Sequence, residues 1–199
     1  NRIPVRYNYD ENYFLNSKWQ GIPLEGYTSI FKNLLDNKRI KIKYNYQFDL
    51  SKITSKKTII YTGPLDRLFN YKFGRLEWRS LRFEKKYFKL NDFQGTSVVN
   101  YPELKNSFTR IHEPKHLHPE RNYTKDKTMI IYEYPVQNLE EPYYPINNTK
   151  NRIMHRKYKT LAKRLNNFFI GGRLADYAYY DMDMTISAAI KLYYRSIKN

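Results

Sequence analysis

Apolar residues recur at helical spacing near the start of the chain. Within residues 27–35, Ile30, Phe31, Leu34 and Leu35 are spaced so that they fall on one side of a helix. The pattern predicts a short amphipathic helix over this segment.

The middle of the chain alternates apolar and polar positions. Ile40, Ile42 and Tyr44 would share one face of a strand. Thr58–Thr62 is a β-branched and aromatic run that stops at Gly63-Pro64, a strong turn signal. A short helical segment is expected over 66–71. The predicted strands are 40–44, 58–62, 76–83, 86–90, 97–101, 108–112 and 129–134.

The last third returns to helical spacing. The pattern predicts a helix over 152–167, a short buried strand over 168–170, and a closing helix over 185–194 after Gly171-Gly172. The fold class is therefore mixed, α+β or α/β. We expect a central mixed or antiparallel sheet of about six strands, flanked by helices.

Composition indicates a folded chain without cysteine chemistry. Of the 199 residues, 41% are hydrophobic and 17% aromatic, which is too rich in aromatics for a disordered chain. No apolar run reaches the roughly 20 residues of a membrane-spanning helix, so no span is predicted. The absence of cysteine excludes disulfides, thiolate catalysis and Cys-ligated zinc, and fits a cytoplasmic protein.

The net charge of +17 comes from 36 basic and 19 acidic residues. It permits three interpretations: a solvated basic surface, nucleic-acid binding, or a few arginines that face a small diphosphate. The charge alone does not choose among them.

The segment from Phe168 to Ile190 carries the most specific chemistry. A strand, a Gly-Gly turn, Arg173 and a helix that opens at Asp181–Thr185 place backbone N–H groups and a guanidinium near one point. This arrangement suits the phosphate or ribityl part of a cofactor. Alternatively, Asp183 caps a structural helix and Arg173 forms a surface ion pair.

Two further segments contain candidate arginines. On a strand, Arg75, Glu77 and Arg79 would point to one side. In the segment 106–119, Arg110 shares a face with Phe108 and His112.

Metal and nucleophile sites are not predicted. His112, His116 and His118 are separated by proline breaks and have no cysteine nearby, which argues against zinc. There is no G-x-S-x-G nucleophile elbow. Any chemistry would then be carried by a cofactor.

Several segments together resemble UDP-galactopyranose mutases. They are RIPVRYNYDENYF, KWQGIPLEGYT, YTGPLDRLFNYKFGRLEWRSLRFE, FQGTSVVNYPE, FTRIHEPKH, EYP, PYYPI and GRLADYAYYDMDMTI, in family order and over essentially the whole chain. The resemblance is to the C-terminal half of the family.

The resemblance implies an FAD-dependent isomerase that interconverts UDP-galactopyranose and UDP-galactofuranose for cell-surface glycans. Reduced flavin would form an N5–sugar adduct, so no side-chain nucleophile is expected. It also implies a cytoplasmic enzyme that is a homodimer at full length and does not bind nucleic acid. The implied regions are the end of a helical and mobile-loop region (1–40), a substrate-binding sheet domain (41–150) and a C-terminal FAD-site segment (151–199).

The resemblance also implies roles for individual residues. Trp19 stands where the family usually has a tyrosine. The implied substrate-binding residues are Arg6, Trp19, Asn100, Arg110, Tyr144 and Tyr179. The implied cofactor-binding residues are Arg79, Gly172, Arg173, Asp181, Met182, Asp183 and Thr185.

The chain departs from the family in one respect. The family begins with a Rossmann-type unit that carries G-x-G-x-x-G, and no such motif occurs among the seven glycines here. We therefore expect the isolated chain to be catalytically incomplete. The alternative is a non-catalytic module that binds a nucleotide-sugar or glycan with the same fold.

Overall fold

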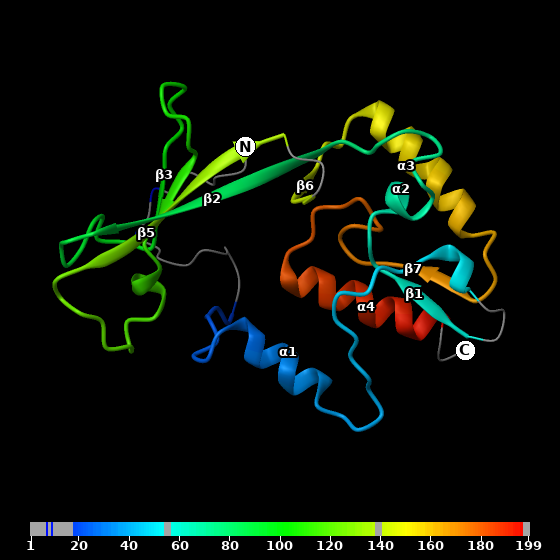
Figure 1. Ribbon diagram of the computed structural model, residues 1–199, viewed down its shortest axis with the longest axis horizontal. Helices are drawn as coiled ribbons and strands as arrows, with labels where there is room; N and C mark the ends of the chain where they lie inside the picture. Colours follow the sequence, from blue (N-terminus) through cyan, green and yellow to red (C-terminus); the bar gives the residue numbers. More distant parts are fainter. Residues whose placement is uncertain (1–6, 8, 10–17, 54–56, 138–140, 197–199) are drawn as a thin grey trace.

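The computed structural model describes residues 7, 9, 18–53, 57–137 and 141–196. Its elements form two bodies, an extended antiparallel sheet and a compact helical part built around a short parallel strand pair (Figure 1). The long strand β2 (Trp78–Phe88) runs from the compact part into the sheet. The mixed class predicted from the pattern is confirmed.

The larger sheet has five strands in the order β3-β4-β5-β2-β6, and every neighbouring pair is antiparallel. The predicted strands 76–83 and 86–90 are one continuous strand, because β2 pairs with β5 without a break from Ser80 to Phe88. The other strands are β3 (Val98–Asn100), β4 (Arg110–His112), β5 (Thr128–Val136) and β6 (Tyr144–Pro145).

The compact part contains a two-stranded parallel sheet of β1 (Ile59–Tyr61) and β7 (Phe168–Ile170). Helices α2 (Leu65–Leu68) and α3 (Thr149–Ala162) pack on each other beside it. The core that they share is wholly apolar or aromatic, and it includes Leu65, Leu76, Trp78, Tyr158, Ala162, Phe168 and Ala175.

Buried polar groups fix the point where the chain enters β2. The Tyr158 hydroxyl donates to the Gly74 carbonyl at 2.7 Å and accepts from the Phe73 N–H at 2.8 Å. The Asp66 carboxylate accepts from the Leu76 N–H at 2.9 Å. Because the Tyr158 hydroxyl and the Asp66 carboxylate both have partners, they order this part of the core without the cost of an unsatisfied group.

The helices begin close to their predicted starts. Helix α1 (Tyr27–Leu35) has the predicted bounds. Helix α3 starts at Thr149, where the Asn148 side chain accepts from the Asn151 N–H, and it ends before 163–167 because those residues turn into β7. Helix α4 (Met182–Ser196) starts three residues before its predicted beginning. Short 3-10 turns lie at η1 (Leu50–Lys52) and η2 (Pro114–Leu117).

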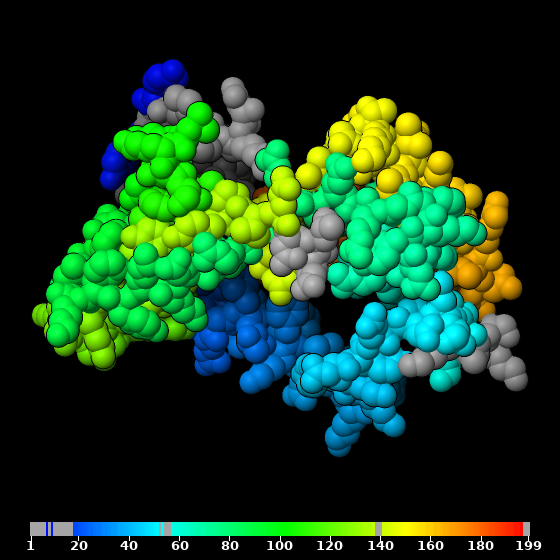
Figure 2. Space-filling view, turned by 45° about the horizontal axis from the view of Figure 1, so that its top comes forward, coloured from blue at the N-terminus to red at the C-terminus, as the bar shows by residue number. Residues whose placement is uncertain are grey.

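The predicted strand over 40–44 is wrong. These residues pair with no strand in the described chain, and Ile40, Ile42 and Tyr44 are exposed. Alternation alone cannot form a strand without a neighbouring edge. Figure 2 shows α1 and the segment after it, in blue to light blue, along one side of the molecule. None of the described helices combines the length and the hydropathy needed to cross a bilayer.

Candidate functional site

One row of paired residues crosses the larger sheet on a single face. In register, Asn100 pairs with Arg110, Arg110 with Glu133, and Glu133 with Phe83. Directly opposed residues on antiparallel strands point to the same side. The sheet therefore brings together Asn100 and Arg110, two residues that the resemblance implies for the substrate.

The Arg110 side chain is held by neighbouring side chains but remains partly exposed to solvent. Its Nε donates to Asn100 Oδ1 at 2.8 Å, and its Nη1 lies 3.8 Å from Glu133 Oε1. The side chain is nevertheless 41% exposed. A fixed guanidinium with free N–H groups is suited to bidentate contact with a phosphate.

Glu133 contacts both His112 and Arg110 in this row. The sequence interpretation did not include it. It is buried, and its Oε2 lies 3.0 Å from His112 Nε2. The hydrogen bond from His112 holds the pKa of Glu133 below its ordinary value, and Arg110 lowers it further. Only the register between β4 and β5 reveals this contact, because nothing in the local sequence links 133 to 110.

Arg79 and Tyr144 lie on the same face, further along β2. They are opposed residues of the β2–β6 pair, and Arg79 and Phe83 share a side of β2 by alternation. The expected common face of Arg75, Glu77 and Arg79 is wrong, because β2 begins only at Trp78. Arg75 instead stacks over Tyr71, and Glu77 accepts from Asn151 and Lys150 at the start of α3.

Tyr144, Tyr179 and Arg173 form a cluster at the β6 edge of the larger sheet. The two tyrosine rings stack at 5.4 Å, and the Arg173 guanidinium lies 4.7 Å from the Tyr179 ring. Burial raises the pKa of the Tyr144 hydroxyl; Tyr179 and Glu133 raise it further, whereas Arg110 and Arg173 oppose the shift.

Within the described part of the chain, Arg173 contacts backbone carbonyls and forms no ion pair. Its Nη1 donates to the Tyr180 carbonyl at 3.1 Å and its Nη2 to the Tyr143 carbonyl at 2.7 Å. It therefore ties the loop before α4 to the segment that enters β6. These two contacts satisfy N–H groups of Arg173 without neutralising its charge.

The remaining residues implied for the cofactor lie between β7 and the start of α4. Asp181 and Thr185 are half-buried, and the Thr185 hydroxyl donates to the Asp181 carbonyl at 2.9 Å. Met182 and Asp183 are exposed in the first turn of α4.

The two glycines before this segment have packing roles. A Cβ on Gly171 would lie 2.8 Å from Leu192 Cδ2, so the absence of a side chain at this position allows α4 to pack closely. Gly172 has a φ of +86° and lies against Thr62. The donors that fit a flavin are therefore Arg173 and the open first turn of α4, more than the Gly-Gly pair itself.

Among the described residues implied for the substrate, Trp19 is not joined to this cluster. Trp19 is exposed, and the ammonium of the neighbouring Lys18 lies 5.6 Å from the centre of its ring. Arg6 lies outside the described residues.

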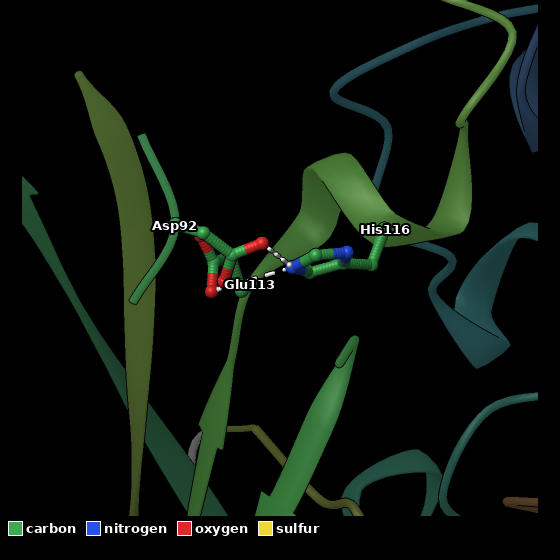
Figure 3. A group of neighbouring side chains, drawn as sticks. All are labelled: Asp92, Glu113 and His116. Carbon is green, nitrogen blue, oxygen red and sulfur yellow. Dashed lines mark ion pairs between the residues drawn. The ribbon is translucent and has the colours of Figure 1, made fainter. Parts of the chain in front are cut away.

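The three histidines once considered for zinc do not converge. His112 contacts Glu133, and His118 contacts Glu120. His116 instead joins Asp92 and Glu113, whose ligand atoms lie within 4.8 Å of one another (Figure 3).

The contacts of the Asp92–Glu113–His116 group attach the loop around residues 92–94 to the sheet. Glu113 accepts from Thr128 Oγ1 at 2.6 Å and from the Gln94 N–H at 2.9 Å. Burial alone would raise the pKa of Glu113, but these hydrogen bonds lower it. The Lys115 ammonium lies 3.5 Å from Glu113 Oε1, where it already supplies a positive charge.

Comparison with known proteins identifies the family of the chain. A family model described as UDP-galactopyranose mutase matches residues 1–179. The chain belongs to the UDP-galactopyranose mutase family.

The curated relatives include mutases of two nucleotide-sugars. The chain is 37% identical over 190 residues to a probable UDP-galactopyranose mutase of Klebsiella pneumoniae, covering 96% of the chain and 49% of the relative. It is 35% identical over 213 residues to the dTDP-fucopyranose mutase of Escherichia coli, covering 100% of the chain and 54% of the relative. It is 36% identical over 207 residues to the UDP-galactopyranose mutase of Mycoplasma genitalium, covering 96% and 51%. The chain spans about half the length of these mutases.

Proposed function

We propose that this chain supplies the diphosphate-binding part of a UDP-galactopyranose mutase, which interconverts UDP-galactopyranose and UDP-galactofuranose. The observation that carries the proposal is that Arg110 lies on the same face of the larger sheet as the cluster of Tyr144, Tyr179 and Arg173. Family membership and the mutase relatives support an isomerase.

The chemistry of the cluster fits a leaving diphosphate. When a sugar–phosphate bond breaks, negative charge builds on the diphosphate, so fixed cations and hydroxyl donors stabilise the transition state more than the ground state. Arg110 is anchored by Asn100 and Glu133, and Arg173 by two carbonyls. Such anchoring lowers the cost of ordering these side chains on binding.

The proposal includes FAD in its reduced form as the cofactor. A bound flavin would supply the electron pair for sugar transfer. Arg79, Gly172, Arg173, Asp181, Met182, Asp183 and Thr185 would hold it, and the exposed first turn of α4 supports this because its N–H groups favour anionic or polar groups. A cytoplasmic location and a homodimer at full length belong to the same proposal.

The nucleotide-sugar is the second part of the proposal. UDP-galactose is favoured because two of the three mutases compared above bear that name, whereas the Escherichia coli relative is named for dTDP-fucopyranose. Competition between UDP and dTDP in one binding assay separates the two substrates. Preferential binding of dTDP would replace UDP-galactose with a dTDP-sugar.

The central test is calorimetric titration of UDP into the chain at two salt concentrations. We expect saturable binding that Arg110→Lys weakens about 10-fold to 100-fold, because an ammonium cannot reproduce a bidentate contact worth about 1.5–3 kcal/mol. The matched control is Arg82→Lys, whose residue stacks on Tyr134 on the opposite face of the sheet. Equal losses in both variants, with affinity collapsing in salt, would leave only a basic surface.

A flavin titration separates the enzyme from a non-catalytic module. We expect FAD absorbance to shift on binding in the presence of UDP, and Arg173→Lys to weaken that shift. UDP binding without any flavin response would favour the module. Turnover by the isolated chain with reduced FAD would contradict the expectation that it is catalytically incomplete.

A further inference from the structure

Helix α3 and the residues after it carry positive charge that no acidic residue interrupts. Residues 149–167 contain seven lysine and arginine residues and no aspartate or glutamate. This segment therefore supplies 7 of the 17 net positive charges of the chain. Charge concentrated in one segment differs from a basic surface that is spread evenly over a protein.

One side of α3 packs on the core. Its buried residues follow helical spacing and are Asn151, His155, Tyr158 and Ala162. The His155 Nε2 donates to the Ala175 carbonyl at 2.8 Å, so this side of α3 faces the segment that carries Arg173 and Tyr179. The other side of α3 is turned away from that segment, and α3 lies at the outer edge of the compact part (Figure 1).

Two rows of exposed basic side chains run along the outer side of α3. At helical spacing they are Arg152, Arg156 and Lys163 in one row, and Lys157 and Arg164 in the other. Ile153 and Thr160 lie between the rows and are also exposed. From residue 152 to residue 164 the rows extend over about 18 Å, at 1.5 Å per residue.

The loop after α2 adds two cations beside these rows. Lys72 and Arg75 are exposed, and their loop is attached to α3 where the Tyr158 hydroxyl accepts from the Phe73 N–H. Figure 2 shows α3 in yellow and the segment around α2 in turquoise, side by side at the surface. We call the five outer residues of α3, together with Lys72 and Arg75, the basic surface of α3.

The basic surface of α3 is not neutralised by carboxylates. Within the described residues, none of its seven members forms an ion pair. The acidic residues nearest to its loop already have partners. Asp66 accepts from the Leu76 N–H, and Glu77 pairs with Lys150 at 2.9 Å. The surface therefore presents its full positive charge to a partner.

The arrangement of this charge favours a planar anionic partner. The adjoining ring of Tyr158 is buried and that of Phe73 is half-buried, so no ring is open for the base stacking that holds single-stranded nucleic acids. Protein interfaces are anchored by side chains that fill pockets, whereas these long side chains stand in two straight rows. Lysine and arginine side chains on a helix reach the headgroups of an anionic bilayer without a pocket.

We propose that the basic surface of α3 docks the protein on an anionic lipid surface. The contact is electrostatic and lies at the level of the headgroups, because the apolar side of α3 already packs on the core. It weakens as salt screens the charges. Docking through this side leaves the segment of Arg173 and Tyr179 uncovered, since that segment faces the inner side of the helix.

Vesicle sedimentation with the 199-residue chain tests the proposal. One set of vesicles is phosphatidylcholine alone, and the other is phosphatidylcholine mixed about 3:1 with phosphatidylglycerol. We expect binding to the mixed vesicles that is lost at high salt, and no binding to phosphatidylcholine alone.

A paired substitution locates the contact. Arg156→Gln with Lys163→Gln removes two charges from one row, so binding to the mixed vesicles should fall about 25-fold, at about fivefold per basic residue. The control is Lys85→Gln with Lys89→Gln, which removes the same charge from exposed residues at the far end of β2. The control should change binding less than about twofold, because screening limits the reach of a charge to about 10 Å.

The second row gives an independent variant. Lys157→Gln with Arg164→Gln should weaken vesicle binding by a similar factor of about 25. All of these substitutions replace exposed side chains, and circular dichroism checks that each variant folds.

Three outcomes would overturn the proposal. The first is the absence of binding to the mixed vesicles, or equal binding to both kinds. The second is an equal loss in the row variants and the control, which would assign binding to the overall charge. The third is tighter binding of a DNA duplex or of polyglutamate that the row variants abolish, which would make a nucleic acid or an acidic protein the partner. None of these outcomes depends on UDP binding, so the proposed function is tested separately.

Discussion

The rings of Tyr144 and Tyr179 stack 5.4 Å apart, with their planes 20° from parallel. One residue belongs to β6 and the other to the loop before α4. The Arg173 guanidinium lies 5.4 Å and 4.7 Å from the two rings. This contact joins the larger sheet to the C-terminal segment at the candidate site.

Arg173→Lys should destabilise the protein through the loop contacts. An ammonium cannot reach the Tyr143 and Tyr180 carbonyls together, so the free energy of unfolding should fall by about 1–3 kcal/mol. Urea denaturation measures the change. Arg82→Lys, at an exposed stacked position, should cost about 0.5 kcal/mol or less. Equal losses of unfolding free energy in the two variants would contradict the role of Arg173 in joining the two loops.

Glu133→Gln should destabilise the row that holds Arg110. The buried carboxylate bonds to His112 and lies near Arg110, so its removal should cost about 1–3 kcal/mol at pH 7. Glu84→Gln is the control, because Glu84 pairs with Arg82 and Lys86 at the surface and should change stability by about 0.5 kcal/mol or less.

The effect of Glu133→Gln should disappear in acid. The folded-state pKa of Glu133 is lowered, so its stabilisation is present above the ordinary pKa of about 4.3 and is lost as pH falls through the folded value. Chemical denaturation at pH 7, 5 and 3.5 should show the two proteins converging. A difference that persists at the lowest pH would mean that the carboxylate charge is not the cause.

His155 should make stability fall below neutral pH. Burial lowers its pKa in the folded state, and its Nε2 donates to the Ala175 carbonyl at 2.8 Å. The unfolded chain therefore takes up the proton first, and stability is lost as pH falls below about 6.5. His155→Gln should flatten this part of the curve, whereas His118→Gln, at a residue paired with Glu120, should not. Thermal melts between pH 8 and 5.5 measure both slopes.

Gly171→Ala should weaken the packing of α4 against residue 171 and lower the free energy of unfolding. The new Cβ would lie 2.8 Å from Leu192 Cδ2, so α4 or that side chain must shift, at a cost of about 1–3 kcal/mol. Leu192→Ala in the same chain should recover part of the loss, which a double-mutant cycle detects. Gly21→Ala meets no atom within 4 Å and serves as the control. Additive effects of the two substitutions would show that the glycine is needed for another reason.

Local pattern predicted the bounds of one helix and of one paired strand, although the apolar side chains of that helix are exposed in the described chain. Tyr27–Leu35 and Phe168–Ile170 have their predicted bounds. The segment 40–44 has the same alternation as a strand but no partner edge, so pattern alone misled there. The division of 76–90 into two strands failed because continuous pairing with β5 overrides the local polar run.

The sequence by itself determined the family, the mixed fold class and the candidate residues Arg110, Tyr144, Arg173 and Tyr179, because these stand in ordered motifs along the chain. Only the tertiary structure decided that Glu133 and His112 support Arg110, that Arg173 ties two loops, and that Glu77 belongs to the start of α3. These contacts depend on strand register and on packing between distant segments. A one-residue shift in register would turn every side chain to the other face, and no local pattern encodes that choice.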